Sequence, residues 1–270
     1  PVPRRREGRR VEGEWIVRCE IVAVGTELLL GQIVESLLHG RKRWRQFFQQ
    51  IAEIGYRSQL VVIITGAFTG AVLAAQALFQ FALVDMETMG GVIVSIGMLR
   101  ELGPTITGLM LAGRVGSSIA AEIGTMKVTE QIDALRSMGV HPIDYLVTPR
   151  ILAMAVSIPL LIAQSVAFGI VASYMVGVHL FKVPGAYWNF NVERFTDGTD
   201  ITIAMVKGFV FGLLIVIISC HQGLRASNGA VGVGRGTTDA MVLSSLAILI
   251  TNLFLTMFMQ IIFPVGFGMT

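Results

Sequence analysis

The chain has 270 residues, of which 53% are hydrophobic and 14% charged, and its formal net charge is +3. A typical soluble domain carries about a quarter of its residues as charged side chains, so this composition excludes an ordinary soluble domain and predicts a membrane protein. Basic residues gather at Arg4–Arg10 and Arg41–Arg45. Such clusters suit the anionic surface of a cytoplasmic leaflet, and nothing in so apolar a chain supports nucleic acid as a partner.

The N-terminal part is expected to divide into two segments. Residues 1–36 are predicted to be basic and poorly ordered, and residues 37–56 to form an amphipathic helix. Apolar side chains such as Trp44, Phe48 and Ile51 recur there at near-helical spacing beside the second basic cluster. This pattern, next to a spanning segment, is typical of a helix lying in the plane of the membrane interface. A soluble helix packed on a partner is the alternative.

Five long apolar stretches follow, each long enough to cross a hydrocarbon core of roughly 30 Å. They cover residues 60–83, 91–119, 148–180, 201–220 and 240–263. The sequence therefore predicts an all-α integral membrane protein with one interfacial helix and five transmembrane helices. Small residues mark where such helices approach closely, and Gly66/Gly70 and Gly208/Gly212 form two GxxxG pairs. The pattern leaves open whether they pack within one chain or between two.

The charges in the connecting segments predict the orientation. Residues 124–150 and 221–238 are read as connections on one side, and their basic residues are Lys127, Arg136, Arg150, Arg225 and Arg235. The opposite side carries Asp85 and Glu87 in one connection and a mixed segment at 182–200. The excess of Lys and Arg places the N-terminus in the cytoplasm and the C-terminus outside. Tyr187 and Trp188 are then expected near the outer interface.

Charged residues occur inside the predicted spans. Arg100 and Glu101 lie in the second span, where a charge facing lipid costs at least about 2.5–3.5 kcal/mol. We expect both to face a polar cavity large enough for a headgroup, because Pro104 follows closely and interrupts the helix. The alternative is that they reach the outer surface along their aliphatic stems. Lys207 and Arg114 are expected to reach the surface in that way.

Residues 127–138 predict a short amphipathic helix between two spans. Lys127 and Arg136 are balanced there by Glu130 and Asp133, so the segment lacks the basic excess of a helix that lies on lipid. We expect it to dock a soluble partner instead.

No catalytic or cofactor-binding motif is apparent. A P-loop requires a lysine directly after glycine, and none of the four lysines has that neighbour. The histidines are too scattered for a metal site, and Cys19 and Cys220 do not suggest a disulfide framework. The chain is therefore expected to hold no cofactor or metal and to be no enzyme.

Four segments resemble the MlaE (YrbE) permeases of bacterial lipid-transport ABC systems. They are Leu99–Pro104 (LRELGP), Leu111–Gly116 (LAGRVG), Ala121–Leu135 (AEIGTMKVTEQIDAL) and Gly232–Thr238 (GVGRGTT). The resemblance covers roughly residues 40–265, and its long contiguous match makes it specific.

The resemblance implies a homodimeric permease domain, here residues 57–270, in the bacterial inner membrane. It also implies a cytoplasmic ABC ATPase dimer that holds ATP and Mg, a periplasmic MCE-domain protein, a small STAS-domain protein and phospholipids as cargo. The ATPase would dock on the segment 127–138, through Lys127, Glu130, Gln131, Asp133, Leu135 and Arg136. An outward-facing lipid pocket would be lined by Gln80, Phe81, Val84, Arg100 and Glu101. Val84 departs from the larger or aromatic residues that the family often has at that position.

Residues 19–34 do not resemble this family. Their sequence, CEIVAVGTELLLGQIV, resembles the opening strand and loop of the CinA nucleotide-binding fold. That fold needs a whole α/β domain, of which only a fragment is present, so the fragment is assigned no activity.

These observations lead to one main hypothesis and two alternatives. The main hypothesis is a permease that moves phospholipid between the membrane and an MCE protein, driven by a separate ATPase, in a direction that the sequence does not reveal. An ion-coupled carrier with Glu101 as the proton carrier is the first alternative. A non-transporting membrane anchor for the MCE complex is the second.

Overall fold

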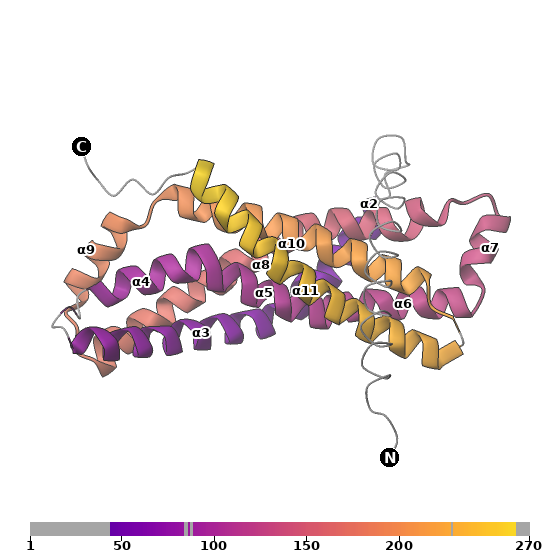
Figure 1. Cartoon of the computed structure of the whole chain (residues 1–270). Coiled ribbons are helices and arrows are strands. Elements are labelled where there is room, and N and C mark those ends of the chain that lie inside the picture. The colour runs from indigo at the N-terminus through magenta and orange to yellow at the C-terminus, as the bar shows by residue number, and fades with distance from the viewer. Residues whose placement is uncertain (1–43, 84–85, 87–88, 228, 263–270) are drawn as a thin grey trace, which may run out of the picture.

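The computed structural model describes residues 44–83, 86, 89–227 and 229–262, and every regular element in these ranges is helical. The helices form one elongated bundle with α7 at one end and α9 at the other (Figure 1). These two ends are called the α7 end and the α9 end below. The N-terminal segment 1–36, its CinA-like part, the first residues of the predicted interfacial helix and Val84 lie outside the described residues.

Five continuous helical segments are long and apolar enough to cross a membrane: Trp44–Ala82, Gly90–Val128, Ile143–Leu180, Gly198–Leu224 and Gly229–Ile262. This confirms the predicted all-α class and the five spans. The helices of the first half are α2 (Trp44–Ile51), α3 (Arg57–Ala82), α4 (Gly90–Gly97), α5 (Gly103–Leu111), α6 (Ser117–Val128) and α7 (Gln131–Ser137). Those of the second half are α8 (Thr148–Met175), α9 (Gly185–Phe195), α10 (Gly198–Leu224) and α11 (Gly229–Ile262).

Several spans contain a π-helical turn of five residues. These turns lie at Ala52–Tyr56, Met98–Leu102, Ala112–Gly116, Ile143–Val147 and Val176–Leu180. A π-helical turn adds a residue to one turn of helix and often marks a functional site. The turn Met98–Leu102 contains both charged residues that the sequence places inside the second span.

Helix α8 forms the centre of the bundle because glycines let two neighbours approach its backbone. A Cβ atom at Gly70 would overlap the backbone of Gly169, and one at Gly66 would lie 2.5 Å from the carbonyl oxygen of Ser165. Both GxxxG pairs therefore pack within the chain, since Gly208 on α10 also faces α8. Close backbone approach supplies dispersion contacts, which are a main source of helix affinity in lipid.

Two connections differ from the sequence-based expectation. The connection predicted over residues 221–238 is wrong, because α10 continues to Leu224 and α11 begins at Gly229, whose φ of +66° only glycine adopts readily. The segment 182–200 contains the helix α9, which was not predicted. Trp188 on α9 is 1% exposed, because Gly91 and Gly177 leave room for its ring.

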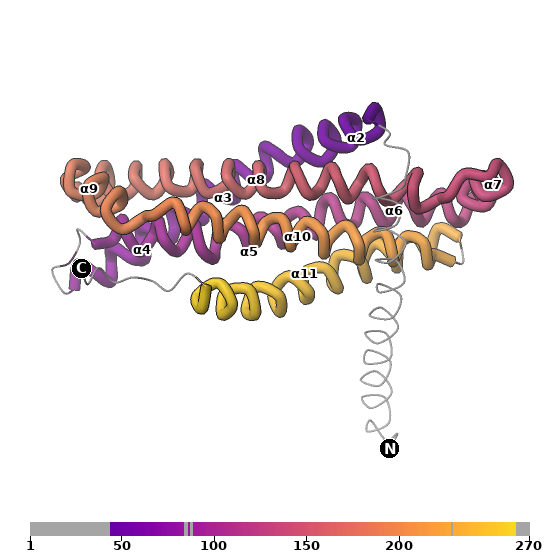
Figure 2. The backbone as a smooth tube through the Cα atoms, turned by 90° about the horizontal axis from the view of Figure 1, so that it is seen from above, coloured from indigo at the N-terminus to yellow at the C-terminus, as the bar shows by residue number. Residues whose placement is uncertain are grey.

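Helix α2 shows the expected division into two faces. Phe47 and Ile51 pack against the core of the bundle, whereas Trp44 and Phe48 are 61% and 63% exposed. Helix α2 lies against α8 on one side of the bundle, and α11 lies on the opposite side (Figure 2). The position of α2 in a membrane interface stays a prediction.

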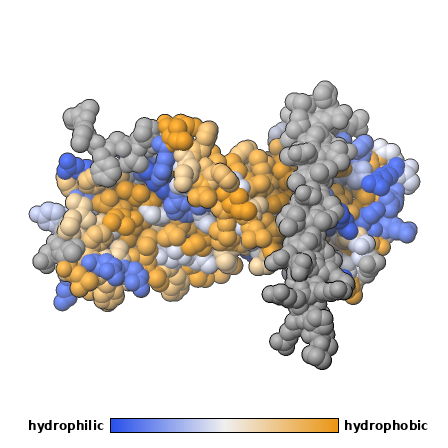
Figure 3. All heavy atoms as spheres, viewed as in Figure 1, coloured by the Kyte–Doolittle hydropathy of each residue, from blue (hydrophilic) through white to orange (hydrophobic). Residues whose placement is uncertain are grey.

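The surface between the two ends of the bundle is largely apolar. On the face shown in Figure 3, apolar side chains cover much of the visible middle of the molecule, and hydrophilic ones gather toward its two ends. Burial is uneven among the spans. In the most apolar 18-residue stretch of each span, 50% is buried in α10, 22% in the α2–α3 span and 11% in α11. Helices α3 and α11 therefore present the largest apolar faces to lipid or to another protein.

The backbone contact between α3 and α8 yields a testable expectation. Gly70→Ala should destabilise the protein by about 1–3 kcal/mol, because the new methyl group meets the Gly169 backbone, which no side-chain rotation can move. The control is Gly234→Ala on α11, where a Cβ meets nothing within 4 Å. Unfolding of both variants in detergent measures the difference, and equal stability of the two would contradict this packing.

Candidate functional site

The candidate site begins at the π-helical turn Met98–Leu102 in the second span. Pro104 has no backbone N–H, so it cannot donate the bond that an α-helix would direct at the carbonyl of Arg100. The Arg100 carbonyl instead accepts a hydrogen bond from Lys207 Nζ of α10 at 2.6 Å. The local sequence thus exposes a backbone acceptor to a neighbouring helix.

Two ion pairs join this turn to α10. Arg100 Nε lies 2.5 Å from Asp200 Oδ1, and Lys207 Nζ lies 2.9 Å from Glu101 Oε1. The four charges cancel within one cluster, which we call the intramembrane charge network. Pairing of this kind offsets part of the cost of removing ions from water.

Helix α11 completes the network through two side chains one turn apart. Thr256 Oγ1 accepts a hydrogen bond from Lys207 at 2.8 Å and donates one to Glu101 Oε1 at 2.9 Å. Asn252 Nδ2 donates to Glu101 Oε2 at 3.0 Å. Both carboxylate oxygens of Glu101 are therefore bound, and three separate spans meet at one residue.

Asp200 also organises the start of α10. Its Oδ2 accepts the backbone N–H of Asp197 at 3.1 Å, in a capping box with Asp197 as the first residue. The other oxygen binds Arg100, so one carboxylate both caps a helix and neutralises a charge on another span. Capping satisfies backbone donors that a helix terminus otherwise leaves without partners.

Exposure differs across the network. The side chains of Asp200 and Lys207 are 1% exposed, that of Arg100 is 22% exposed, and that of Glu101 is 40% exposed. The network is therefore closed on the α10 side and open at Glu101. A ligand could reach Glu101 and the edge of Arg100 without unpacking the bundle.

The remaining residues predicted for the lipid pocket lie farther along the bundle. Gln80 is exposed and Phe81 half-buried at the end of α3. Gly97 faces Leu73, so Arg100 lies near the depth of residue 70 of α3. At 1.5 Å per residue, Gln80 is then about 15 Å closer to the α9 end. The structure brings Arg100 and Glu101 together but does not join them directly to Gln80 and Phe81.

Four members of the network were not predicted as site residues: Asp200, Lys207, Asn252 and Thr256. The expectation that Lys207 reaches the membrane surface is wrong, because it is fully buried and bonded to Glu101. Its sequence signal was a single cation in an apolar stretch, which requires an anion elsewhere in the membrane. Glu101 is that anion, but the pairing of these two residues cannot be read from local spacing.

The predicted coupling segment forms the α7 end of the bundle. Glu130 has a left-handed backbone with φ of +58°, which reverses the chain between α6 and α7. Ile132 is buried and anchors α7 to the core. Glu130 and Gln131 are exposed, whereas Leu135 packs partly against the core.

Charged residues in this segment pair with one another at the surface. Asp133 accepts from Lys127 Nζ at 3.4 Å and from Arg136 Nη1 at 3.1 Å. Lys127, Ile132 and Arg136 also line a cavity of about 260 Å³ with the turn at His141. A helix with one anchoring side chain and an exposed polar face is well suited to contact a partner.

Comparison with known proteins gives matches along most of the chain. A family model described as "Permease MlaE" matches residues 47–258. A probable ABC transporter permease protein of Synechocystis sp. is 39% identical over 236 residues, which cover 87% of this chain and 90% of that protein. One from Rickettsia conorii is 43% identical over 208 residues, 77% of this chain and 80% of that protein. The chloroplastic protein TRIGALACTOSYLDIACYLGLYCEROL 1 of Arabidopsis thaliana is 36% identical over 86% of this chain and 66% of its own.

The charge network predicts the effect of removing its cation. Lys207→Met should lower the free energy of unfolding by about 1–3 kcal/mol, because Glu101 loses its main partner while it remains partly exposed to solvent. Lys182→Met is the control, since Lys182 is exposed and surface substitutions usually change stability by less than about 0.5 kcal/mol. Chemical unfolding in detergent distinguishes them, and similar stability of the two variants would refute the role of Lys207.

Proposed function

Because the chain belongs to the MlaE permease family, we propose that it moves phospholipid or a related lipid between the inner membrane and a periplasmic MCE-domain protein. The chain is the multi-pass membrane subunit of an ABC transporter, and permeases of this kind have no catalytic activity of their own. ATP and Mg are accordingly expected in the separate ATPase subunit.

The observation that carries the lipid proposal is the open edge of the charge network beside an apolar surface. Glu101 is partly exposed next to Asn252 of α11, and the same helix exposes Leu249, Leu253 and Phe254. A polar group bordered by exposed apolar side chains matches a lipid, which has a charged headgroup and apolar tails. The Arabidopsis relative is named after trigalactosyldiacylglycerol, which is a glycerolipid, and this name supports the same class of cargo.

Arg100 is the residue we propose to contact the lipid phosphate. It uses Nε for Asp200, and its terminal guanidinium nitrogens have no partner among the described residues. A guanidinium binds phosphate oxygens in a planar, bidentate manner. Gln80, Phe81 and Val84 are then proposed to line the outer part of the same path, toward the α9 end.

The α7 end is proposed to face the cytoplasm. Lys127, Arg136, Arg225 and Arg235 lie there, and a basic excess on one side favours the cytoplasmic location. The described N-terminal helix then begins on the cytoplasmic side, and α11 ends toward the periplasm. The MCE-domain protein is proposed to bind at the α9 end.

The partners follow from the exposed surfaces. The ATPase pair is proposed to dock on α7 through the exposed residues of its segment, with a STAS-domain protein on the same side. A second copy of the chain is proposed to pack against α11, the least buried span. An ABC permease requires an ATPase partner. We therefore expect ATP hydrolysis to drive transport only while the ATPase is docked on this surface.

Reversing the acidic charges of the coupling segment tests the proposed docking. Glu130→Lys combined with Asp133→Lys should abolish most ATPase-driven lipid transfer in the reconstituted complex, because reversing two charges at a docking face disturbs its charge complementarity with the partner. The fold should persist, since the exposed ion pairs of Asp133 contribute at most about 1 kcal/mol. Glu193→Lys, an exposed change at the α9 end, is the control. Full transfer by the double variant, with normal membrane insertion, would argue for an ion-driven carrier or another docking surface.

The proposed lipid path is tested by photocrosslinking. A photoreactive residue at position 81, 84 or 100 should label a tagged phospholipid, whereas one at Met138, which is exposed on the α7 end, should not. The expected ratio is at least about tenfold, since a crosslinker reacts only within contact distance. Absence of lipid labelling at all three positions would exclude this path.

A further inference from the structure

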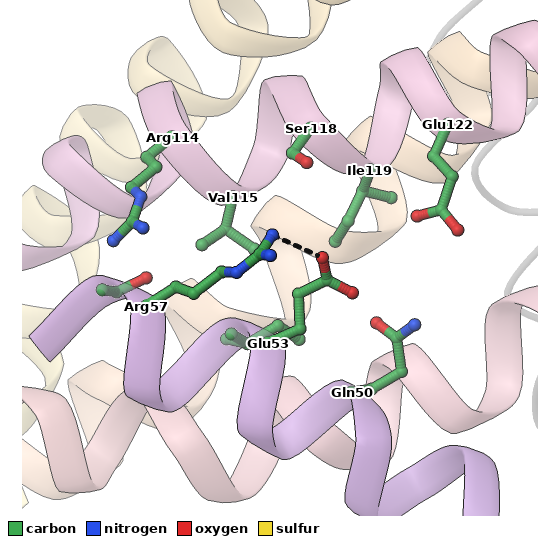
Figure 4. Close-up of a pocket in the computed structure, with 10 residues that line it drawn as sticks. Gln50, Glu53, Arg57, Arg114, Val115, Ser118, Ile119 and Glu122 are labelled. Carbon is green, nitrogen blue, oxygen red and sulfur yellow. Dashed lines mark hydrogen bonds and ion pairs between the residues drawn. The ribbon is translucent and has the colours of Figure 1, made fainter.

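A second cavity lies at the α7 end of the spans, apart from the charge network. Its volume is about 110 Å³, several times the roughly 10–15 Å³ that one water molecule needs. Two helical segments form its opposing walls (Figure 4). Their polar side chains are Gln50, Glu53, Arg57 and Ser58 on one and Arg114, Ser118 and Glu122 on the other.

The charges around this cavity leave one cation in excess. Arg57 Nη1 binds Glu53 at 3.1 Å, and Glu122 binds the buried Arg150 at 2.7 Å. Both carboxylates are therefore neutralised by an arginine. Arg114 has no side-chain hydrogen bond or ion pair among the described residues, and Figure 4 shows its guanidinium pointing toward the helix that carries Arg57.

A buried hydroxyl group supplies a second, independent indication. Ser58 lines the cavity and is 1% exposed, yet its hydroxyl has no hydrogen-bond partner within the described part of the chain. Buried polar atoms are nearly always bonded to protein or to ordered water, so a partner for this hydroxyl is expected in the cavity. Arg114 lines the same cavity, which therefore offers hydrogen-bond donors from both residues to an acceptor bound there.

Apolar side chains continue from the cavity toward the middle of the bundle. Leu60 and Ile64 follow Arg57 by one and two helical turns on the same face, and they are 68% and 47% exposed. Met110 precedes Arg114 by one turn on the other wall and is 37% exposed. A basic mouth followed by an exposed apolar face fits a molecule with an anionic head and hydrocarbon tails.

We propose that this cavity binds the phosphate of an anionic glycerophospholipid from the leaflet at the α7 end. Arg114 and Arg57 bind the phosphate oxygens, and Ser58 donates a hydrogen bond. The acyl chains lie along Leu60 and Ile64. This site rests on the proposed function only in one respect, namely that the leaflet at the α7 end is the cytoplasmic one. The site is distinct from the proposed transport path at Glu101.

The existing pair at Arg57 does not prevent binding. The Arg57 and Glu53 side chains are 70% and 51% exposed, and exposed pairs of this kind are weak. Arg57 can therefore exchange Glu53 for a phosphate, because a bidentate contact between a guanidinium and a phosphate is stronger than this exposed ion pair. The single excess charge favours an anionic lipid over a zwitterionic one, and the apolar continuation favours a lipid over free phosphate.

Lipid retention in nanodiscs tests the site. Wild-type protein is reconstituted in phosphatidylcholine with phosphatidylglycerol as a minor component, and co-purifying lipid is counted by native mass spectrometry. We expect the wild type to retain phosphatidylglycerol selectively. The variant Arg114→Gln combined with Arg57→Gln should retain at least about tenfold less of it, because it loses hydrogen bonds from two charged donors. Arg114→Lys, which keeps the charge without the planar fork, should retain an intermediate amount.

Arg225→Gln is the matched control, because Arg225 is an exposed arginine at the same end outside the cavity. Equal retention by wild type and the double variant would overturn the proposal, as would equal retention of the two lipids. Thermal protection by glycerol phosphate as strong as that by phosphatidylglycerol would also overturn it, by indicating a site for free phosphate. None of these readouts requires ATPase or transfer activity, so failure of the proposed transport would leave the result interpretable.

Discussion

The structure depends on the pairing of charges that the chain buries among apolar helices. Removing an ion from water is costly, so a lysine at the centre of a bundle is stable only with an anion and further hydrogen bonds. Lys207 meets this requirement through Glu101, Thr256 and a backbone carbonyl. These partners come from two spans, and Lys207 itself lies on a third, so the requirement fixes how the three spans lie relative to one another.

The two kinds of packing in the bundle have different consequences. Glycines hold α3 and α10 directly against the backbone of α8, and such backbone contacts leave little freedom to slide. Helix α11 is far less buried, and at the depth of Glu101 it is joined to the second span by Asn252 and Thr256. Rearrangement during transport would therefore involve α11 more readily than α3 or α8.

The sequence predicts the spans well but predicts their contacts poorly. Apolar length alone places five spanning helices, because a bilayer imposes that length. The predicted spans left residues 221–238 as a connection, yet most of that segment is helical. The burial of Trp188 and the pairing of Lys207 were not predicted, because each depends on residues distant in sequence. Lys207 and Glu101 are separated by 106 positions. Arg100 and Glu101 were found because charges within a span are rare.

Glu101 and Lys207 are expected to stabilise one another across two spans. A double-mutant cycle with Glu101→Gln and Lys207→Met, measured by unfolding in detergent, tests this directly. Because each single change leaves one charge of the network without its partner, the double variant should be less destabilised than the sum of the singles by about 0.5–3 kcal/mol. Additive effects of the two substitutions would show that the residues do not interact and would contradict the account.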